Sequence, residues 1–171
     1  MNKKYPWKQA VITGVIVGII AVITFSLSKQ AHLSISASTL RGLTGLLTLV
    51  ILGIGIYVGM RSIKTANESK LAYGQAVFSG FIIALVTGII TAVVSAIYCS
   101  IIDPDYTAYM IGETQKAMLS SGKSQAEITA AAPVLQQQWS TGGQVIQALI
   151  GQTVCGTVIA LIMAIFLKTK K

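Results

Sequence analysis

The chain has 171 residues, of which 53% are hydrophobic and 11% are charged, and its mean hydropathy of +0.72 excludes an ordinary soluble domain. Its formal net charge of +8 is high enough to suggest binding to nucleic acid. The positions of the charges exclude that interpretation, because every charged residue lies in a gap between four long apolar stretches.

The four apolar stretches cover residues 10–28, 42–60, 74–102 and 142–167. An α-helix needs about 20 residues to cross the ~30 Å hydrocarbon core of a bilayer. We therefore expect an all-α, polytopic membrane protein in which residues 1–171 form one membrane domain with four transmembrane helices. The first stretch follows lysines, as a signal peptide does, but it is longer than the roughly 7–15 apolar residues of a signal sequence. We interpret it as a retained helix.

Two pairs of glycines mark the expected packing faces of the first two spans. Gly14 and Gly18 in the first span and Gly55 and Gly59 in the second both have G-x-x-x-G spacing. Small residues on one face allow membrane helices to approach closely. We expect these faces to pack the two spans against each other, and the alternative is that they join two copies of the chain in a homo-oligomer.

The third and fourth spans carry a few polar side chains. Thr87, Thr91 and Ser95 are four residues apart and form a line along the third span, and Gln152 lies deep in the fourth. Such groups commonly bond between helices in membranes. We expect Gln152 to bond to Thr91 or Ser95, and the alternative is that these residues line a path for a solute.

Residues 103–140 form the only loop long enough for structure of its own. Asp103-Pro104 is typical of a helix start, and Gly122 of a helix stop. Ser124 and Glu127 then have the spacing of a capping box. The residues that follow place an apolar stripe on one face of a second helix, namely Ile128, Ala131, Ala132, Leu135 and Trp139. We predict an amphipathic helical hairpin outside the cytoplasm.

Sorting the charges by gap predicts the orientation. The two termini and the second gap hold nine basic residues and one acidic residue, whereas the first and third gaps hold four of each. Basic residues near span ends stay in the cytoplasm. We therefore expect both termini in the cytoplasm, a location in the bacterial inner membrane, and the hairpin on the outer side.

Several of these features resemble a known family. They are the short basic and aromatic N-terminus, Tyr73-Gly74-Gln75-Ala76, Gly80, and Ile102-Asp103-Pro104-Asp105-Tyr106 before a helical segment. Together they resemble the bacterial membrane family known as domain of unknown function 4199, common in the Bacteroidetes group. The resemblance covers nearly the whole chain and implies a four-span inner-membrane protein, with no activity, cofactor or catalytic residue to carry over. The segment after the third span is rich in Ala, Ser and Gln here, where the family implies more charge.

The sequence offers little for catalysis or metal binding. His32 is the only histidine, and no Cys, Asp or Glu stands near it at ligand spacing. The spans contain no His or Lys that could act as a base. Asp103 and Asp105 are the only plausible acids for an enzyme that modifies lipid. We therefore predict no catalytic residue, no metal and no cofactor.

Three functions remain as hypotheses. The first is a non-enzymatic membrane protein whose outer helices bind lipid or a membrane protein partner, with a surface formed by Asp103, Asp105, Tyr106, Tyr109 and Trp139. The second is a small oligomeric transporter or channel, for which flux of small solutes into liposomes is the test. The third is a lipid-modifying enzyme, which Ala at both aspartates would inactivate.

Overall fold

The computed structural model describes residues 6–29 and 37–169, and every element in these ranges is helical. His32 lies outside the described residues. The elements are α1 (Trp7–Ser28), α2 (Ala37–Ala66), α3 (Tyr73–Ile97), the π-helical turn η1 (Tyr98–Ile102), α4 (Tyr106–Ser120), α5 (Gln125–Trp139) and α6 (Thr141–Leu167). The predicted spans agree with α1, α3 with η1, and α6, whereas α2 extends beyond residues 42–60 at both ends.

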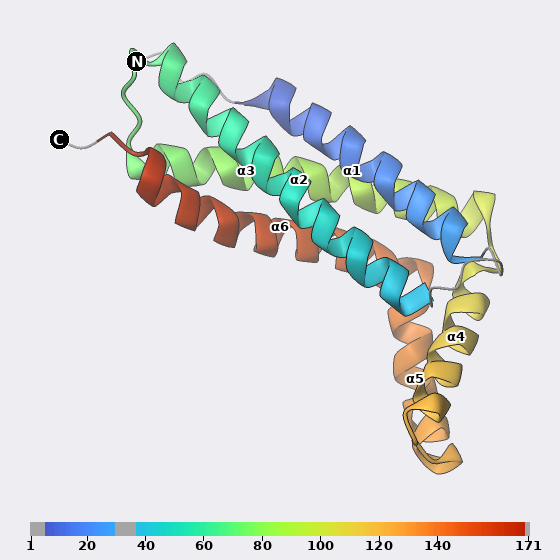
Figure 1. Cartoon of the computed structure of the whole chain (residues 1–171). Coiled ribbons are helices and arrows are strands. Elements are labelled where there is room, and N and C mark those ends of the chain that lie inside the picture. The colour runs from blue at the N-terminus through green and yellow to red at the C-terminus, as the bar shows by residue number, and fades with distance from the viewer. Residues whose placement is uncertain (1–5, 30–36, 170–171) are drawn as a thin grey trace.

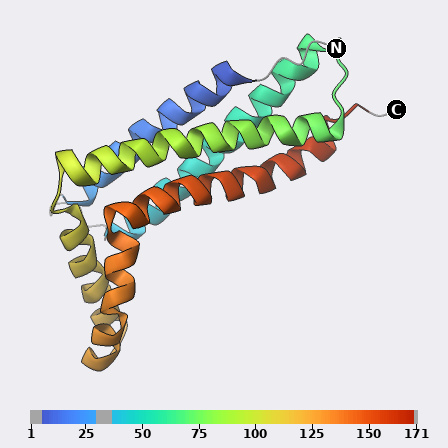
Figure 2. The ribbon, with the colours of Figure 1, turned by 180° about the vertical axis from the view of Figure 1, so that it is seen from behind.

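The four long helices α1, α2, α3 and α6 form a bundle in which successive helices run in opposite directions (Figure 1). Each is long and apolar enough to cross a membrane, so this is a multi-pass membrane protein with four spans. α3 lies beside both α6 and α1, and Figure 2 shows α3 and α6 running side by side along the molecule. We call the end of the bundle next to α4 and α5 the hairpin end, and the opposite end the charged end.

The close contact between α3 and α6 depends on small residues of each helix that pack against small residues of the other. A Cβ atom at Gly156 would overlap the Cβ of Ala84 and lie 3.4 Å from its Cα, and a Cβ at Gly80 would overlap the Cβ of Ala160. These glycines therefore let the two backbones approach more closely than any side chain would allow.

The glycine pairs predicted from the sequence do pack, but not all against the expected helix. Cβ atoms at Gly14 and Gly18 would meet Ile90 and Val94 of α3. The prediction that they face α2 is therefore wrong, because α1 turns this face toward α3. Gly55 of α2 faces Thr13 of α1 as expected, whereas Gly59 mainly faces Ile83 of α3.

At the charged end, hydrogen bonds join the end of α2, the loop before α3 and the end of α6. Lys64 donates from Nζ to the carbonyl of Leu167 at 2.9 Å, where the C-terminus of α6 leaves carbonyls without helical partners. The amide of Thr169 donates to the carbonyl of Leu71 at 3.0 Å, and the amide of Leu71 donates to Oγ1 of Thr169 at 2.9 Å. The last residues of the fourth span are thus fixed to the loop before the third.

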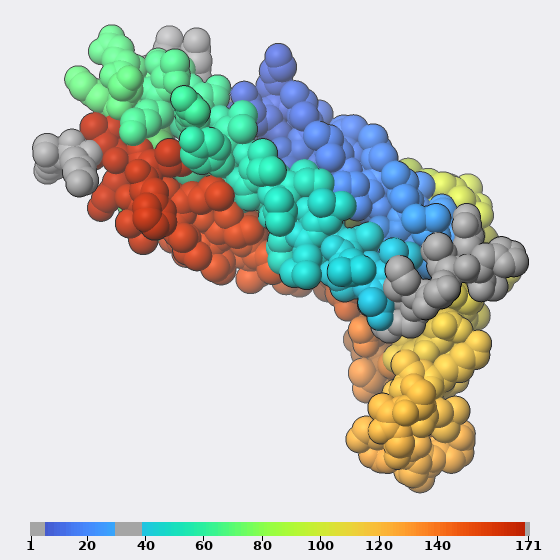
Figure 3. All heavy atoms as spheres, in the orientation of Figure 1, coloured from blue at the N-terminus to red at the C-terminus, as the bar shows by residue number. Residues whose placement is uncertain are grey.

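The remaining helices, α4 and α5, form a hairpin that projects away from the bundle (Figures 1 and 3). The predicted capping box is confirmed, since Ser124 and Glu127 satisfy each other's backbone amides. Gly122 has φ +85° and follows the end of α4, as predicted. The amide of Lys123 donates to the carbonyl of Met118 at 3.0 Å and completes this C-terminal motif.

The start of the hairpin differs from the prediction. Asp103 does not cap α4, because α3 ends in the π-helical turn η1, where the amide of Asp103 donates to the carbonyl of Tyr98 at 2.8 Å. α4 begins only at Tyr106. The carboxylate of Asp103 instead accepts from Nζ of Lys29 at 2.8 Å, so it links the ends of α1 and α3.

Candidate functional site

The base of the hairpin is held to the bundle by a cluster of aromatic side chains. Tyr106 of α4 is fully buried, and its ring centroid lies 5.1 Å from that of Phe25 and 5.6 Å from that of Tyr98. Trp139, at the end of α5, is 8% exposed and belongs to the same cluster. The predicted apolar stripe of α5 packs into this cluster at its C-terminal end, because Leu135 is also buried there.

This burial corrects the predicted interaction surface. The large apolar rings of Tyr106 and Trp139 are buried against the bundle, where packing stabilises them. They are therefore not available to an outside partner. Tyr109 is half-buried and donates from its hydroxyl to the carbonyl of Ser28. Asp103 is paired with Lys29, and of the five predicted residues only Asp105 is exposed.

Arg41, in the second turn of α2, lies at the centre of this junction. Nη1 of Arg41 donates to the hydroxyl of Tyr106 at 2.6 Å, and Nη2 donates to Oε1 of Gln144 at 3.3 Å. The guanidinium carbon lies 4.7 Å from the centroid of Trp139 and 5.6 Å from that of Phe25, within the range of cation–π attraction. Two hairpin residues therefore help to fix its position.

The charge of Arg41 has no acidic partner within the described ranges. A guanidinium has five N–H donors, and within residues 6–29 and 37–169 only two of its nitrogens bond to protein side chains. Burial raises the pKa of Tyr106, so its hydroxyl stays neutral at physiological pH and does not neutralise the arginine. Arg41 thus retains both positive charge and donors.

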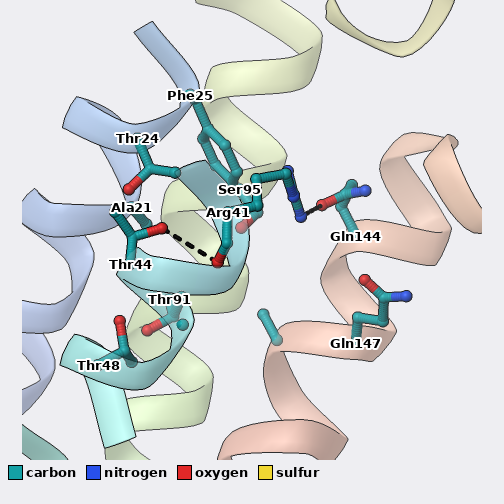
Figure 4. Close-up of a pocket in the computed structure, with 12 residues that line it drawn as sticks. Ala21, Thr24, Phe25, Arg41, Thr44, Thr48, Thr91, Ser95, Gln144 and Gln147 are labelled. Atoms are coloured by element: carbon teal, nitrogen blue, oxygen red, sulfur yellow. Dashed lines mark hydrogen bonds between the residues drawn. The ribbon is translucent and has the colours of Figure 1, made fainter. Parts of the chain in front are cut away.

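Arg41 borders an open polar pocket of about 190 Å³ that residues of α1, α2, α3 and α6 line at the hairpin end (Figure 4). Its polar lining consists of Thr24, Arg41, Thr44, Thr48, Thr91, Ser95, Gln144 and Gln147. Ligand pockets for whole drug-sized molecules measure about 300–1,000 Å³. The pocket is therefore sized for one polar group, such as a phosphate or carboxylate with a few waters.

Some of these polar groups are already bonded and others are not. Thr91 donates to the carbonyl of Thr87 at 2.9 Å, and Thr24 donates to that of Ile20 at 2.7 Å. The hydroxyls of Thr48 and Ser95 and the amide of Gln147 make no hydrogen bond within the part of the chain that is described. The pocket thus offers neutral donors beside one cation.

The predicted polar line on α3 is buried, with Thr87, Thr91 and Ser95 all at most 6% exposed. Thr91 and Ser95 line the pocket, and Thr87 lies one turn further from the hairpin end. Among the residues that the structure describes, its hydroxyl is buried without a partner, and so is Oε1 of Gln152. The predicted bond from Gln152 to Thr91 or Ser95 is therefore not formed.

Sequence reasoning missed Arg41 as a site residue and treated it as one loop charge among four. A signal was present, because Arg41 is the only Lys, Arg, Asp or Glu between Lys29 and Arg61. A single charge beside an apolar stretch in a membrane protein commonly marks a functional position. Gln144 and Phe25 gave no comparable signal, since each resembles an ordinary residue at a span end.

The chain belongs to the family described as Protein of unknown function (DUF4199), whose model matches residues 8–169. The resemblance seen in the sequence is thereby confirmed over nearly the whole chain. No curated protein and no solved structure shows significant similarity to it.

Proposed function

We propose that this chain is a non-enzymatic protein of the bacterial inner membrane that binds a membrane lipid at its hairpin end. Both termini lie in the cytoplasm, and the α4–α5 hairpin lies outside it. The proposal rests on one observation: an arginine that has no acidic partner among the described residues is positioned beside a polar pocket by Tyr106 and Trp139 of the hairpin. Lipid head groups are the membrane component that supplies anionic and polar groups at the ends of the spans, where this pocket lies.

The location of the pocket supports lipid over a soluble ligand. Arg41 is near the start of α2, and the predicted span begins directly after it at residue 42. Lipid head groups lie at the ends of membrane spans, and arginine side chains commonly extend to that level. The exposed residues that surround the bundle are mostly apolar, so lipid is also the molecule present at highest concentration.

Photolabelling tests lipid binding directly. With a phospholipid that carries a photoreactive group near its glycerol, we expect crosslinks in purified membranes to concentrate on peptides that contain Arg41 and Gln144, both at the pocket. Exposed faces at the same end of the bundle, such as Ile101 of η1, serve as the internal control. Equal labelling of the pocket and of these faces would contradict specific binding.

Cysteine labelling tests the proposed orientation. Ser120 at the end of α4 and Thr65 near the end of α2 are both exposed and lie at opposite ends of the bundle. In a chain with Cys99 and Cys155 replaced by Ser, we expect an impermeant maleimide to label S120C in intact spheroplasts. T65C should react only after the cells are opened. The reverse pattern would show that the hairpin is cytoplasmic.

A second candidate is a small oligomeric channel. The buried hydroxyl of Thr87 and Oε1 of Gln152 have no partners in the described part of the chain, and each lies one helical turn inward from a residue of the pocket lining. Unsatisfied buried polar atoms commonly hold ordered water, which a path for solutes would require. Absence of solute flux from the purified protein in liposomes would remove this candidate.

A further inference from the structure

We infer that the bound lipid is an anionic phospholipid whose phosphate lies against Arg41 and whose acyl chain lies in an apolar groove between α2 and α6. This inference rests on the proposed function and makes it specific, since it names the chemical class of the lipid and the path of its chain. Two separate features of the structure, one polar and one apolar, carry it.

The polar feature is the pocket with its uncompensated charge. Arg41 retains N–H groups beyond those that bond to Tyr106 and Gln144, and no Asp or Glu of the described residues forms an ion pair with it. Guanidinium groups bind phosphate oxygens through paired, charge-assisted hydrogen bonds. The free hydroxyls of Thr48 and Ser95 can donate to the remaining oxygens.

The apolar feature is a groove of about 710 Å³ between α2 and α6, lined mainly by Leu, Ile, Val and Met side chains. Gly53 forms part of its wall, where an added Cβ would lie 3.7 Å from Cε of Met163 and 3.9 Å from Cγ2 of Ile159. Those are ordinary contact distances, so alanine fits at this position. A larger side chain would instead occupy the groove.

The pocket and the groove share no lining residue, and they come nearest on α2, where Gly45 of the pocket lies one turn before Leu49 of the groove. The groove reaches Tyr57, which is about 18 Å along the helix from Gly45 at 1.5 Å per residue. One leaflet contributes about 15 Å of hydrocarbon. A head group in the pocket would therefore leave room for one acyl chain of the same leaflet.

The local charge of Arg41 beside the pocket favours an anionic head group over a zwitterionic one. Lys29 is neutralised by Asp103 at 2.8 Å, a bond that raises the pKa of Lys29, whereas Arg41 is not neutralised. A choline group would bring a second cation near the arginine. Phosphatidylglycerol has the same phosphate without that cation, so it should bind more tightly than phosphatidylcholine with the same chains.

The test compares these two lipids by native mass spectrometry of the purified, delipidated protein in detergent. For the unaltered chain we expect phosphatidylglycerol to bind about tenfold more tightly than phosphatidylcholine, the effect of one charge-assisted interaction. R41Q should reduce the preference to about twofold or less. R61Q, which removes an exposed arginine from the other end of the same helix, is the matched control and should keep it.

Variants of the groove test the path of the acyl chain. G53F should weaken binding of both lipids about tenfold or more, whereas G53A should bind them as the unaltered chain does. Glycerophosphoglycerol, which is phosphatidylglycerol without its acyl chains, should not displace bound lipid. Displacement by it, or full binding to folded G53F, would overturn the role of the groove.

The outcomes separate this inference from the proposed function. Equal binding of the two lipids at the photolabelled site would overturn the inference on charge and leave lipid binding intact. Absence of any site-specific lipid would overturn both. Circular dichroism and the thermal midpoint of each variant establish that a loss of binding does not come from unfolding.

Discussion

Replacing Gly156 with leucine is expected to destabilise the association of α3 with α6 by about 3 kcal/mol, the upper end of the range for overpacked interiors. Even the first added carbon would overlap the Cβ of Ala84, approach its Cα to 3.4 Å and lie 3.1 Å from Cδ2 of Leu52. A rotamer change cannot relieve the overlap with the Cβ of Ala84, because the backbone fixes the position of a Cβ atom. α3 and α6 must therefore separate, and the thermal midpoint measured in detergent should fall by many degrees.

Gly151 provides the matched control on the same helix. It is exposed, and an added Cβ would meet no atom within 4 Å. G151L and G156L change intrinsic helix propensity in the same way, so the difference between them measures packing alone. A stable G156L protein with an unchanged midpoint would show that α3 and α6 do not cross as closely as described.

Replacing Tyr106 with alanine is expected to detach the base of the hairpin from the bundle. Removing a large buried aromatic side chain costs about 3–5 kcal/mol, and Tyr106 is fully buried between Phe25 and Tyr98. Arg41 would also lose its acceptor at 2.6 Å. Limited proteolysis should then cut near the base of α4 much faster, and amide exchange there should accelerate.

Two further variants separate the ring from the hydroxyl group. Y106F keeps the ring packing and removes the hydroxyl that accepts from Arg41, so the hairpin should stay attached while the position of Arg41 becomes less defined. Y73A removes an exposed tyrosine at the start of α3, near the charged end, and should leave proteolysis of the hairpin unchanged. Equal proteolysis of Y106A and the unaltered chain would contradict the described junction.

Local rules account for what sequence reasoning predicted correctly. The spans follow from the length of apolar helix that a bilayer requires. The ends of the hairpin helices follow from caps whose partners are at most five residues apart, such as Ser124 with Glu127 and Met118 with Lys123. The expected cap at Asp103 failed because the carboxylate bonds to Lys29, which lies 74 residues away in the sequence.

The site depends on distant partners, and this is why the sequence did not reveal it. Arg41 bonds to Tyr106, 65 residues away, and to Gln144, 103 residues away. No period or spacing in the chain indicates which helix faces will meet. Tyr106 and Trp139 were therefore predicted to form part of an outer surface, because they are aromatic residues of the segment between the third and fourth spans. Their burial places them inside the junction instead.

The sequence alone determined the number of spans, the separation of charge between the two ends and the helical hairpin, because each depends on hydropathy or on neighbours a few residues apart. Only the tertiary structure decided that Gly14 and Gly18 face α3, that Gly156 meets Ala84, and that Arg41 borders a polar pocket. These depend on how four apolar helices rotate and cross. Apolar side chains cover most faces of such helices, so their pattern does not select one packing over another.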